Sequence, residues 1–326
     1  MVSTPADIGT RTVGEVGEDA LIAAITARLA EVQGTAPAAV LLGSGDDAAV
    51  VEAADSRVVV STDVLVEGRH YRRDWSGPAE IGCRAAAANL ADIAAMGAVP
   101  TALVVALAVP ADREVAWVLG LAEGLGAEAA SAGAAVVGGD LVRSEVVSVS
   151  VTALGSLQGR APVTRSGARP GDLVAVAGRL GWAAAGFAVL SRGFRSPRVL
   201  VDALRRPAPP YAEGPRAASL GATAMVDVSD GLVRDLGHVA AASGVAIALS
   251  SDAFHVPQEF LDTARALNAD PLHWLLGGGD DHALAACFPA DVDLPMAWSV
   301  VGRVQPGEGV LVDGAPWTGP SGWQSF

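Results

Sequence analysis

The sequence contains no lysine, and all 22 of its basic residues are arginine. A Walker A phosphate loop and a protein kinase each place a lysine on the nucleotide phosphates, and a pyridoxal enzyme needs one for its Schiff base. The composition therefore excludes these three classes of protein, whatever caused the absence of lysine.

Cysteine and long apolar stretches are also scarce. The two cysteines, Cys83 and Cys287, are isolated in the sequence, which argues against a disulfide framework and against a zinc site. The longest apolar run, residues 98–109, is too short to cross a bilayer, and the first residues lack the basic start and apolar core of a signal peptide. We therefore expect no membrane partner and a cytoplasmic location.

The formal net charge of −14 argues against a nucleic-acid partner, because a surface that binds nucleic acid must neutralise phosphates. The chain has 326 residues, of which 51% are apolar, so it can bury the cores of two domains. Turn residues gather near residues 157–160. We therefore expect an N-terminal domain of residues 1–158 and a C-terminal domain of residues 159–326.

Hydrophobic periodicity predicts helices and strands that alternate along both halves, and hence a mixed α/β fold. The expected helices are residues 18–33, 79–96, 112–132, 182–190, 229–239, 258–267 and 272–276. The expected strands are residues 39–42, 103–108, 134–137, 146–155, 172–177, 223–228, 247–249 and 282–288, together with an apolar run that starts at residue 58. Residues 205–210 are expected to form a proline-rich surface connection. The alternation in residues 147–151 predicts a sheet with one less buried face, which another subunit could cover.

Acidic and hydroxyl side chains recur where strands are expected to end. The run from residue 58 leads into Ser61-Thr62-Asp63, with His70 a few residues later. Similar groups are Gly45-Asp46-Asp47, Gly138-Gly139-Asp140, residues 227–231 and residues 277–281, and Asn89 and Asp92 lie on one face of the helix expected over residues 79–96. Each site has an ordinary structural interpretation as a solvated turn, a helix cap or a carboxylate bonded to nearby backbone.

Together these carboxylates predict a cation site if the loops converge, because they would otherwise repel one another. Oxygen ligands without a cluster of histidine or cysteine favour Mg²⁺ or Mn²⁺ over zinc. Arg165 lies in a turn beside Gly167 and is a candidate fixed cation for a phosphate, since no lysine is present. The pattern therefore predicts phosphoryl transfer from a nucleotide, with metals and Arg165 supporting the transition state.

In this order, and over nearly the whole chain, the motifs resemble those of the thiamine-monophosphate kinases. These enzymes belong to a wider ATP-binding superfamily that includes aminoimidazole ribonucleotide synthetase. The resemblance implies a homodimer of two-domain chains, with N-terminal sheets that meet across the dimer and with ATP and several Mg²⁺ ions between the domains. It implies direct transfer of the γ-phosphate of ATP to thiamine monophosphate, which gives thiamine diphosphate without a covalent phosphoenzyme.

The resemblance also implies roles for individual residues. The implied metal ligands are Asp47, Ser61, Thr62, Asp63, Asp92, Asp140, Asp227 and Asp230. The implied ATP contacts are Gly139, Asp140, Arg165 and Ser229, and the implied contacts to thiamine monophosphate are His70, Asp280 and Trp323.

The sequence departs from the family pattern at two loops. Asp280 stands where the family usually has a glutamate, and His282 where it usually has a tyrosine; threonines are also common in the family after the aspartate at position 140. Other superfamily members fit less well: the hydrogenase maturation factor should end in a cysteine-bearing tail, and selenophosphate synthetase needs an early cysteine and usually a lysine. Two alternatives are kept: another ATP-using enzyme of the same superfamily, and, because Asp280 is shorter than glutamate, a nucleotide-binding regulator without turnover.

Overall fold

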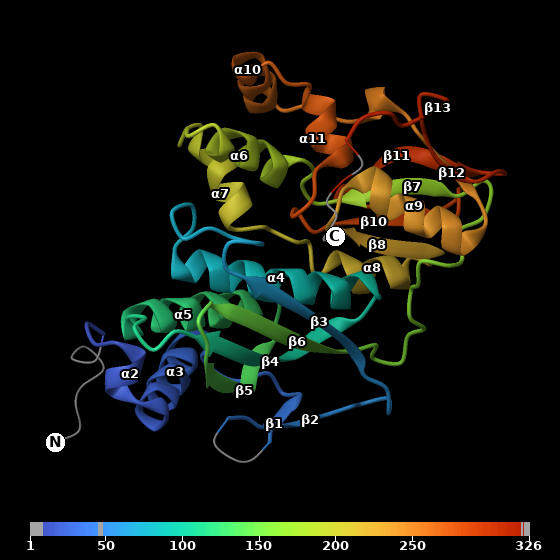
Figure 1. Cartoon of the computed structure of the whole chain (residues 1–326). Helices are drawn as coiled ribbons and strands as arrows, with labels where there is room; N and C mark the ends of the chain where they lie inside the picture. The colour runs from blue at the N-terminus through green and yellow to red at the C-terminus, as the bar shows by residue number, and fades with distance from the viewer. Residues whose placement is uncertain (1–8, 45–47, 321, 323–326) are drawn as a thin grey trace. The chain divides into compact units, whose positions relative to one another are not determined.

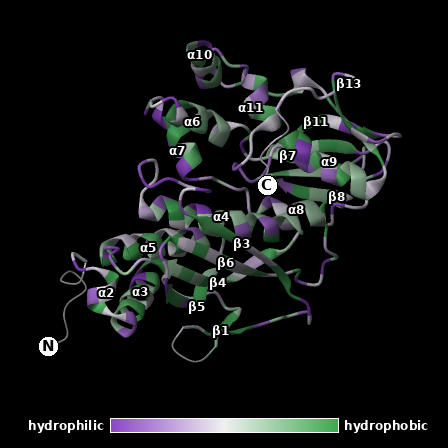
Figure 2. Cartoon of the chain, in the orientation of Figure 1, coloured by the Kyte–Doolittle hydropathy of each residue, from purple (hydrophilic) through white to green (hydrophobic). Residues whose placement is uncertain are grey.

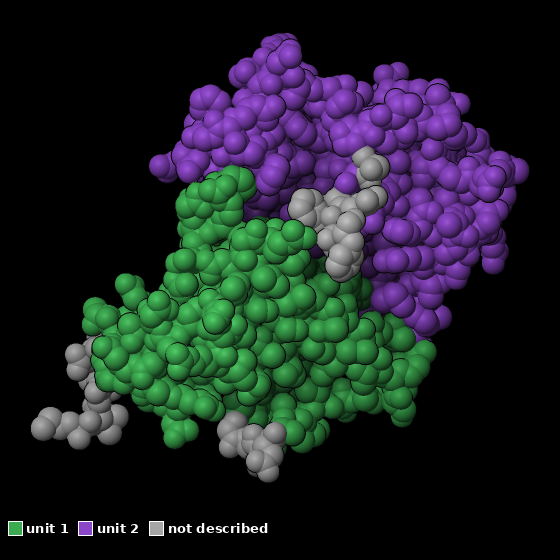
Figure 3. Space-filling model, in the orientation of Figure 1, with its two compact units in different colours: residues 1–93, 100–158 green, residues 94–99, 159–326 purple. Residues whose placement is uncertain are grey.

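The computed structural model describes residues 9–44, 48–320 and 322 of the chain. The chain divides into two compact units, one made of residues 1–93 and 100–158 and the other of residues 94–99 and 159–326 (Figure 3). The short segment 94–99 belongs with the second unit, where the Val163 N–H donates to the Met96 carbonyl at 3.1 Å. Among the described residues, no helix is long and apolar enough to cross a membrane.

The first unit contains a four-stranded sheet, and its strands lie in the order β3-β6-β4-β5 (Figure 1). Its strands are β1 (Val40–Leu42), β2 (Val50–Val51), β3 (Val59–Val66), β4 (Val99–Val109), β5 (Ala135–Arg143) and β6 (Ser148–Ser156), of which β1 and β2 form a separate two-stranded sheet. Its helices are α2 (Val13–Val16), α3 (Glu18–Gln33), α4 (Pro78–Ala95) and α5 (Val115–Ser131).

The helices α4 and α5 cover one face of this sheet (Figure 1). Burial on β6 alternates as the sequence predicts: Val149, Val151 and Ala153 are fully buried, whereas Ser150 and Thr152 are half-buried. On the neighbouring strand β3, Val60 and Val64 are exposed. One face of the four-stranded sheet therefore packs on helices, and the other is only partly covered within the chain.

The second unit contains a seven-stranded sheet with the order β13-β12-β9-β11-β7-β10-β8. Its strands are β7 (Leu173–Ala177), β8 (Ala224–Val228), β9 (Ala246–Leu249), β10 (Ala283–Phe288), β11 (Trp298–Gln305), β12 (Gly309–Val312) and β13 (Ala315–Pro316). Its helices are α6 (Trp182–Ser191), α7 (Arg198–Arg205), α8 (Glu213–Ser219), α9 (Leu232–Ser243), η1 (Ser251–Ala253), α10 (Gln258–Leu267) and α11 (Pro271–Gly277).

The strands β7, β10 and β8, which lie side by side at one end of the sheet order, are buried on both faces and are almost entirely hydrophobic (Figure 2). Val226 and Ala285 pack on the side of α9 and α11, while Met225 and Ala286 pack on the side of α8. Strands covered on both sides have continuous apolar sequences, as these do. Since β10 pairs with both β7 and β8, the ends of these strands have fixed positions within the unit.

Two expectations about strand ends are wrong. Ser61-Thr62-Asp63 lies in the middle of β3, because the strand continues through Val66 and pairs with β6 as far as Ser148. The Gly138-Gly139-Asp140 sequence also lies inside a strand, because β5 continues beside β4 as far as Arg143. The carboxylates of Asp63 and Asp140 are therefore held on strands and do not belong to loops that follow them.

Two expectations about the second half also need correction. The helix expected from Ser229 begins instead at Leu232, because residues 229–231 form a turn whose N–H groups bond to Asp235. The region expected as a surface connection contains buried Pro207 and Pro209 and directly follows α7, a helix that the periodicity did not reveal.

Candidate active site

Two segments of the second unit, residues 227–231 and residues 277–282, pack directly against each other. The Asp280 N–H donates to the Ser229 carbonyl at 2.8 Å, and the His282 N–H donates to the Val228 carbonyl at 3.0 Å. These bonds extend the antiparallel pairing of β8 and β10 beyond the strand ends. The structure therefore brings Ser229 and Asp280 together, although about fifty residues separate them in the sequence.

Glycine is required where these two segments meet. A Cβ atom at Gly279 would lie 2.2 Å from the Ser229 carbonyl oxygen, and one at Gly231 would lie 2.8 Å from that of Gly277. Gly231 also has a φ of 137°, which residues with a side chain rarely adopt. The glycines of both motifs therefore permit a close approach of two backbones.

Asp227 and His282 form a buried pair where these two segments meet. The Asp227 carboxylate lies 3.1 Å from Nδ1 of His282, and the two residues are 3% and 7% exposed. His282 reaches this position with a φ of 53°, next to Asp280 at 64°. In the sequence, His282 stands out only as a departure from the family pattern, and in the structure it contacts a predicted metal ligand.

The neighbouring carboxylates have different partners. Asp230 forms an ion pair with Arg234 at 3.2 Å. Asp235 accepts N–H groups of Asp230 and Gly231, both at 3.0 Å, and burial raises the pKa of its carboxyl to about 7. Asp235 therefore fixes the backbone turn that carries Asp230.

Asp281 is buried beside the candidate substrate residue Asp280. Its Oδ1 accepts the Ala183 N–H at 3.0 Å, at the start of α6, while Oδ2 has no hydrogen-bond partner among the described residues. Burial raises the pKa of the Asp281 carboxyl to about 7. This residue anchors the loop to α6, while the neighbouring Asp280 side chain is exposed.

The turn that carries Arg165 is held by the end of α9. The Ser243 hydroxyl donates to the Arg165 carbonyl at 3.1 Å and accepts the N–H of Gly167 at 3.1 Å and of Ala168 at 3.2 Å. The Arg165 side chain is exposed. Ser243 is a positioning residue that the sequence analysis missed, because a serine at the end of a helix is not distinctive by itself.

In the first unit, the structure joins two predicted metal ligands. The Ser61 hydroxyl on β3 donates to the Asp92 carboxylate on α4 at 2.5 Å. The Thr62 hydroxyl donates to the Val151 carbonyl at 3.0 Å and lies 3.1 Å from the Thr152 hydroxyl. Since neighbouring strand residues point to opposite faces, Ser61 and Asp63 lie on one face of β3 and Thr62 on the other.

Gly139 and Asp140 line a cavity of about 630 Å³ in the first unit. Its other walls are mostly aliphatic and come from α3, α5 and β4, with Ser44 and Ala48 from the loop after β1. A Cβ atom at Gly139 would lie 2.0 Å from the Val105 carbonyl oxygen, whereas nothing lies within 4 Å of one at Gly138. Gly139 therefore allows β5 to approach β4 closely beside Asp140.

His70 has a fixed hydrogen-bonding pattern. Its Nδ1 accepts the Val66 N–H at 2.9 Å, so Nε2 carries the proton of the neutral ring and can donate to a ligand. The His70 carbonyl accepts from Arg84 at 3.3 Å. This arrangement suits a contact to a substrate acceptor.

The predicted site residues Asp47 and Trp323 lie outside the described residues. Within the described part of the chain, no group of three or more histidine, cysteine, aspartate or glutamate side chains is arranged to hold a metal ion. The donors are nevertheless carboxylate and hydroxyl oxygens, and the buried Oδ1 of Asn89, one turn before Asp92, has no partner among the described residues. This chemistry fits Mg²⁺, and the assignment of individual ligands stays a prediction.

Comparison with known proteins identifies the family to which the two halves of the chain belong. Residues 45–157 match the family described as AIR synthase related protein, N-terminal domain, and residues 169–313 match its C-terminal domain. The two-domain α/β architecture predicted from the sequence is confirmed by these matches.

The similarity to individual relatives identifies the enzyme family more narrowly. The thiamine-monophosphate kinase of Mycobacterium tuberculosis is 52% identical over 89% of this chain and 87% of its own length. That of Corynebacterium glutamicum is 38% identical over 97% and 95% of the two chains. A solved structure described as AaThiL complexed with AMPPCP and TMP is 32% identical, covers 97% of this chain and 99% of its own, and has a TM-score of 0.78. The chain belongs to the thiamine-monophosphate kinase family, which confirms the family and the enzyme class predicted from the sequence.

Proposed function

We propose that the chain transfers the γ-phosphoryl group of ATP to the phosphate of thiamine monophosphate, which gives thiamine diphosphate. The observation that carries this proposal is the 52% identity to the thiamine-monophosphate kinase of Mycobacterium tuberculosis over nearly the full length of both chains. The neighbour complexed with AMPPCP and TMP supports the same pair of ligands. In this reaction the substrate phosphate is the nucleophile, so no protein nucleophile is needed.

In the second unit, Asp227 and Asp230 would hold Mg²⁺, while Arg165 and Ser229 would contact ATP. Mg²⁺ supplies neutralisation of the charge on the transferring phosphoryl oxygens. The hydrogen bond from His282 and the turn held by Asp235 keep the two carboxylates in fixed positions. Arg165 is the fixed cation, because its backbone is held by Ser243.

In the first unit, Asp63, Asp92 and Asp140 would be metal ligands, together with Ser61, Thr62 and Asp47. The backbone at Gly139 would lie along the nucleotide. Asp280, His70 through its Nε2 proton, and Trp323 would contact thiamine monophosphate. The Asp280 carboxylate is exposed, so its negative charge is accessible to the cationic thiamine group.

A coupled assay for ADP release tests the reaction. We expect ADP release that depends on both thiamine monophosphate and Mg²⁺, and that stops in excess chelator. Calorimetry should show an ATP affinity that falls strongly in the chelator. ATP binding without any ADP release in the presence of thiamine monophosphate would instead identify a regulator, and equal ATP affinity with and without chelator would reject the metal sites.

We also propose a homodimer formed through the four-stranded sheet of the first unit. The support is the partly covered face of this sheet, where Val60 is 62% and Val64 is 45% exposed. Exposed apolar residues on an edge strand are unfavourable in water and favour association. Light scattering at micromolar concentration should give twice the mass of 32.7 kDa, and Val60→Asp should shift the protein toward the monomer.

A further inference from the structure

A basic segment runs from the end of α6 through the whole of α7, on a chain with a negative net charge. Residues 192–206 contain a single acidic residue, Asp202, whereas the whole chain has a formal net charge of −14. The basic residues of this segment are Arg192, Arg195, Arg198, Arg205 and Arg206. None of them belongs to the candidate active site described above.

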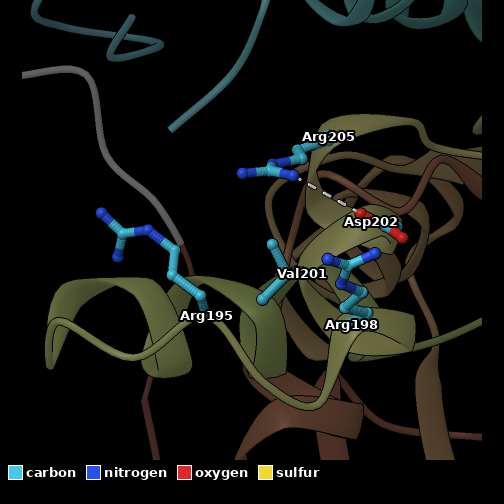
Figure 4. A pocket seen from close by; sticks show the side chains of 5 residues that line it. All are labelled: Arg195, Arg198, Val201, Asp202 and Arg205. Carbon is cyan, nitrogen blue, oxygen red and sulfur yellow. Dashed lines mark ion pairs between the residues drawn. The ribbon is translucent and has the colours of Figure 1, made fainter. Parts of the chain in front are cut away.

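Three of these arginines line a recess of about 320 Å³ on the second unit (Figure 4). Its lining consists of Arg195, Arg198, Val201, Asp202 and Arg205. Figure 4 shows Arg195 on one side of Val201 and Arg198 on the other. Val201 is 2% exposed and forms the floor, so the wall that faces solvent is almost entirely charged.

The arginines of the recess have few anionic partners. Arg205 lies 3.6 Å from the Asp202 carboxylate, while Arg195 and Arg198 form no ion pair with any described residue. Other exposed arginines of the same unit do have acidic partners: Arg216 pairs with Glu213 at 3.2 Å and Arg265 with Asp262 at 3.3 Å. Two guanidinium groups in the recess are therefore available to an external anion.

The start of α7 adds to the positive potential. Pro197 is its N-cap residue and offers no capping side chain, the first turn contains no acidic residue, and Arg198 is the first helical residue. A positive charge at the positive end of a helix dipole is unfavourable, and a bound anion would relieve it.

We propose that this recess binds the diphosphate group of a small molecule. Arg198 and Arg205 are about 10 Å apart along the helix axis, at 1.5 Å per residue, which a diphosphate held by long side chains spans better than a single phosphate. Guanidinium groups bind phosphate oxygens in pairs of hydrogen bonds. Because Val201 is the one apolar side chain in the lining, the recess recognises the anion and not an attached ring. If the proposed function holds, the diphosphates formed in the reaction are thiamine diphosphate and ADP.

The test is titration calorimetry of the full chain with inorganic diphosphate in excess EDTA, which removes the metals on which phosphate binding at the active site depends. We expect Arg195→Ala/Arg198→Ala to weaken binding by about tenfold or more, since each variant loses charge-assisted hydrogen bonds. Asp202→Asn should strengthen binding, because it removes the carboxylate that repels the ligand. Arg265→Ala, which removes an exposed arginine of α10, should leave the affinity unchanged.

Separate titrations with different diphosphates identify which molecule the recess binds. Equal affinity for inorganic diphosphate, ADP and thiamine diphosphate supports recognition of the diphosphate alone, and tighter binding of one product supports that product as the ligand. Unchanged affinity in the double arginine variant, or weaker binding in Asp202→Asn, would overturn the proposal. ADP release measured on the same proteins separates this outcome from a failure of the proposed function, since the double variant should retain turnover.

Discussion

The two units position their acidic residues in different ways. In the second unit, Asp227 lies in β8 and Asp230 on the turn that follows it, and this stretch is bonded to a second segment, with a buried histidine and the carboxylate of Asp235 fixing the geometry. In the first unit, Asp63 and Asp140 lie in the middle of strands, where the sheet fixes the backbone and the side chains stay exposed. The second unit therefore fixes its acidic residues through contacts between distant segments, whereas the first unit fixes them mainly through strand pairing.

The largest effect on turnover is expected where residues 227–231 and residues 277–282 of the second unit meet. Gly279→Ala would place a Cβ atom 2.2 Å from the Ser229 carbonyl, so the two segments must separate. We expect turnover to fall by about a hundredfold or more, and the free energy of unfolding by about 1–3 kcal/mol. Steady-state kinetics and urea unfolding measure these effects.

Gly237→Ala is the matched control within α9. Nothing lies within 4 Å of a Cβ atom there, so alanine should stabilise the helix by up to about 1 kcal/mol. Full turnover in Gly279→Ala would show that the close approach of the two segments does not matter for the reaction.

The next effect is expected at Asp280, which carries the contact to thiamine monophosphate in our proposal. Loss of a hydrogen bond to a charged group costs about 1.5–3 kcal/mol, so Asp280→Ala should raise the Michaelis constant for thiamine monophosphate about tenfold to a hundredfold. Asp280→Glu should keep or lower this constant. If Asp280→Ala raised the constant for ATP alone, the residue would belong to the nucleotide side.

A similar but smaller effect is expected at Gly139 in the first unit. Gly139→Ala would bring a Cβ atom to 2.0 Å from the Val105 carbonyl and push β5 away from β4. We expect ATP affinity to fall about tenfold, as if one charge-assisted contact were lost. Gly138→Ala, with open space around its Cβ atom, serves as the neighbouring control. Equal affinities in the two variants would remove this backbone from the nucleotide site.

His282→Asn tests whether the buried pair fixes Asp227. Asparagine tolerates the positive φ at this position but leaves the Asp227 carboxylate with a shorter partner. We expect the free energy of unfolding to fall by about 1–3 kcal/mol, and Mg²⁺ affinity measured by calorimetry to weaken. Unchanged Mg²⁺ affinity together with lower stability would give His282 a role in folding alone.

The smallest effect is a change in pH dependence at Asp281. The pKa of about 7 in the folded protein lies above the usual value near 4 in an unfolded chain, so the folded state binds more protons between these values. The wild-type protein should therefore lose stability relative to Asp281→Asn as pH rises from 5 to 8, by about 1–3 kcal/mol. Urea unfolding at both pH values measures the difference in the free energy of unfolding between the wild type and Asp281→Asn. If this difference does not change with pH, the Asp281 carboxylate is solvated in the folded protein.

Local signals in the sequence predicted two helices to the residue. The helices α3 and α10 have the predicted bounds, because Gly17 and Gly34 flank the first and Pro257 and Asn268 flank the second. Strand ends were less predictable: β3 and β5 run past their polar residues because a partner strand continues beside them. The length of a strand is set by its neighbour, which a pattern within one segment does not contain.

The same limit applies to the candidate site. The acidic residues stand out in the sequence by their glycine-rich surroundings, and the enzyme class followed from them. The contact of Asp227 with His282 and the support of Arg165 by Ser243 depend on pairing between distant segments. Neither a single histidine nor a single serine carries a local signal of such a role.

The position of β8 in the sheet has a consequence for how the enzyme is made. This strand lies at the end of the sheet order and pairs with β10, so residues 224–228 leave the ribosome well before residues 283–288 that complete them. Until then an apolar strand has an open edge, which is a hazard for aggregation in a growing chain. A chain released before residue 283 would therefore leave the side of β8 that pairs with β10 open, and this edge is most exposed to aggregation in the interval between the synthesis of the two strands.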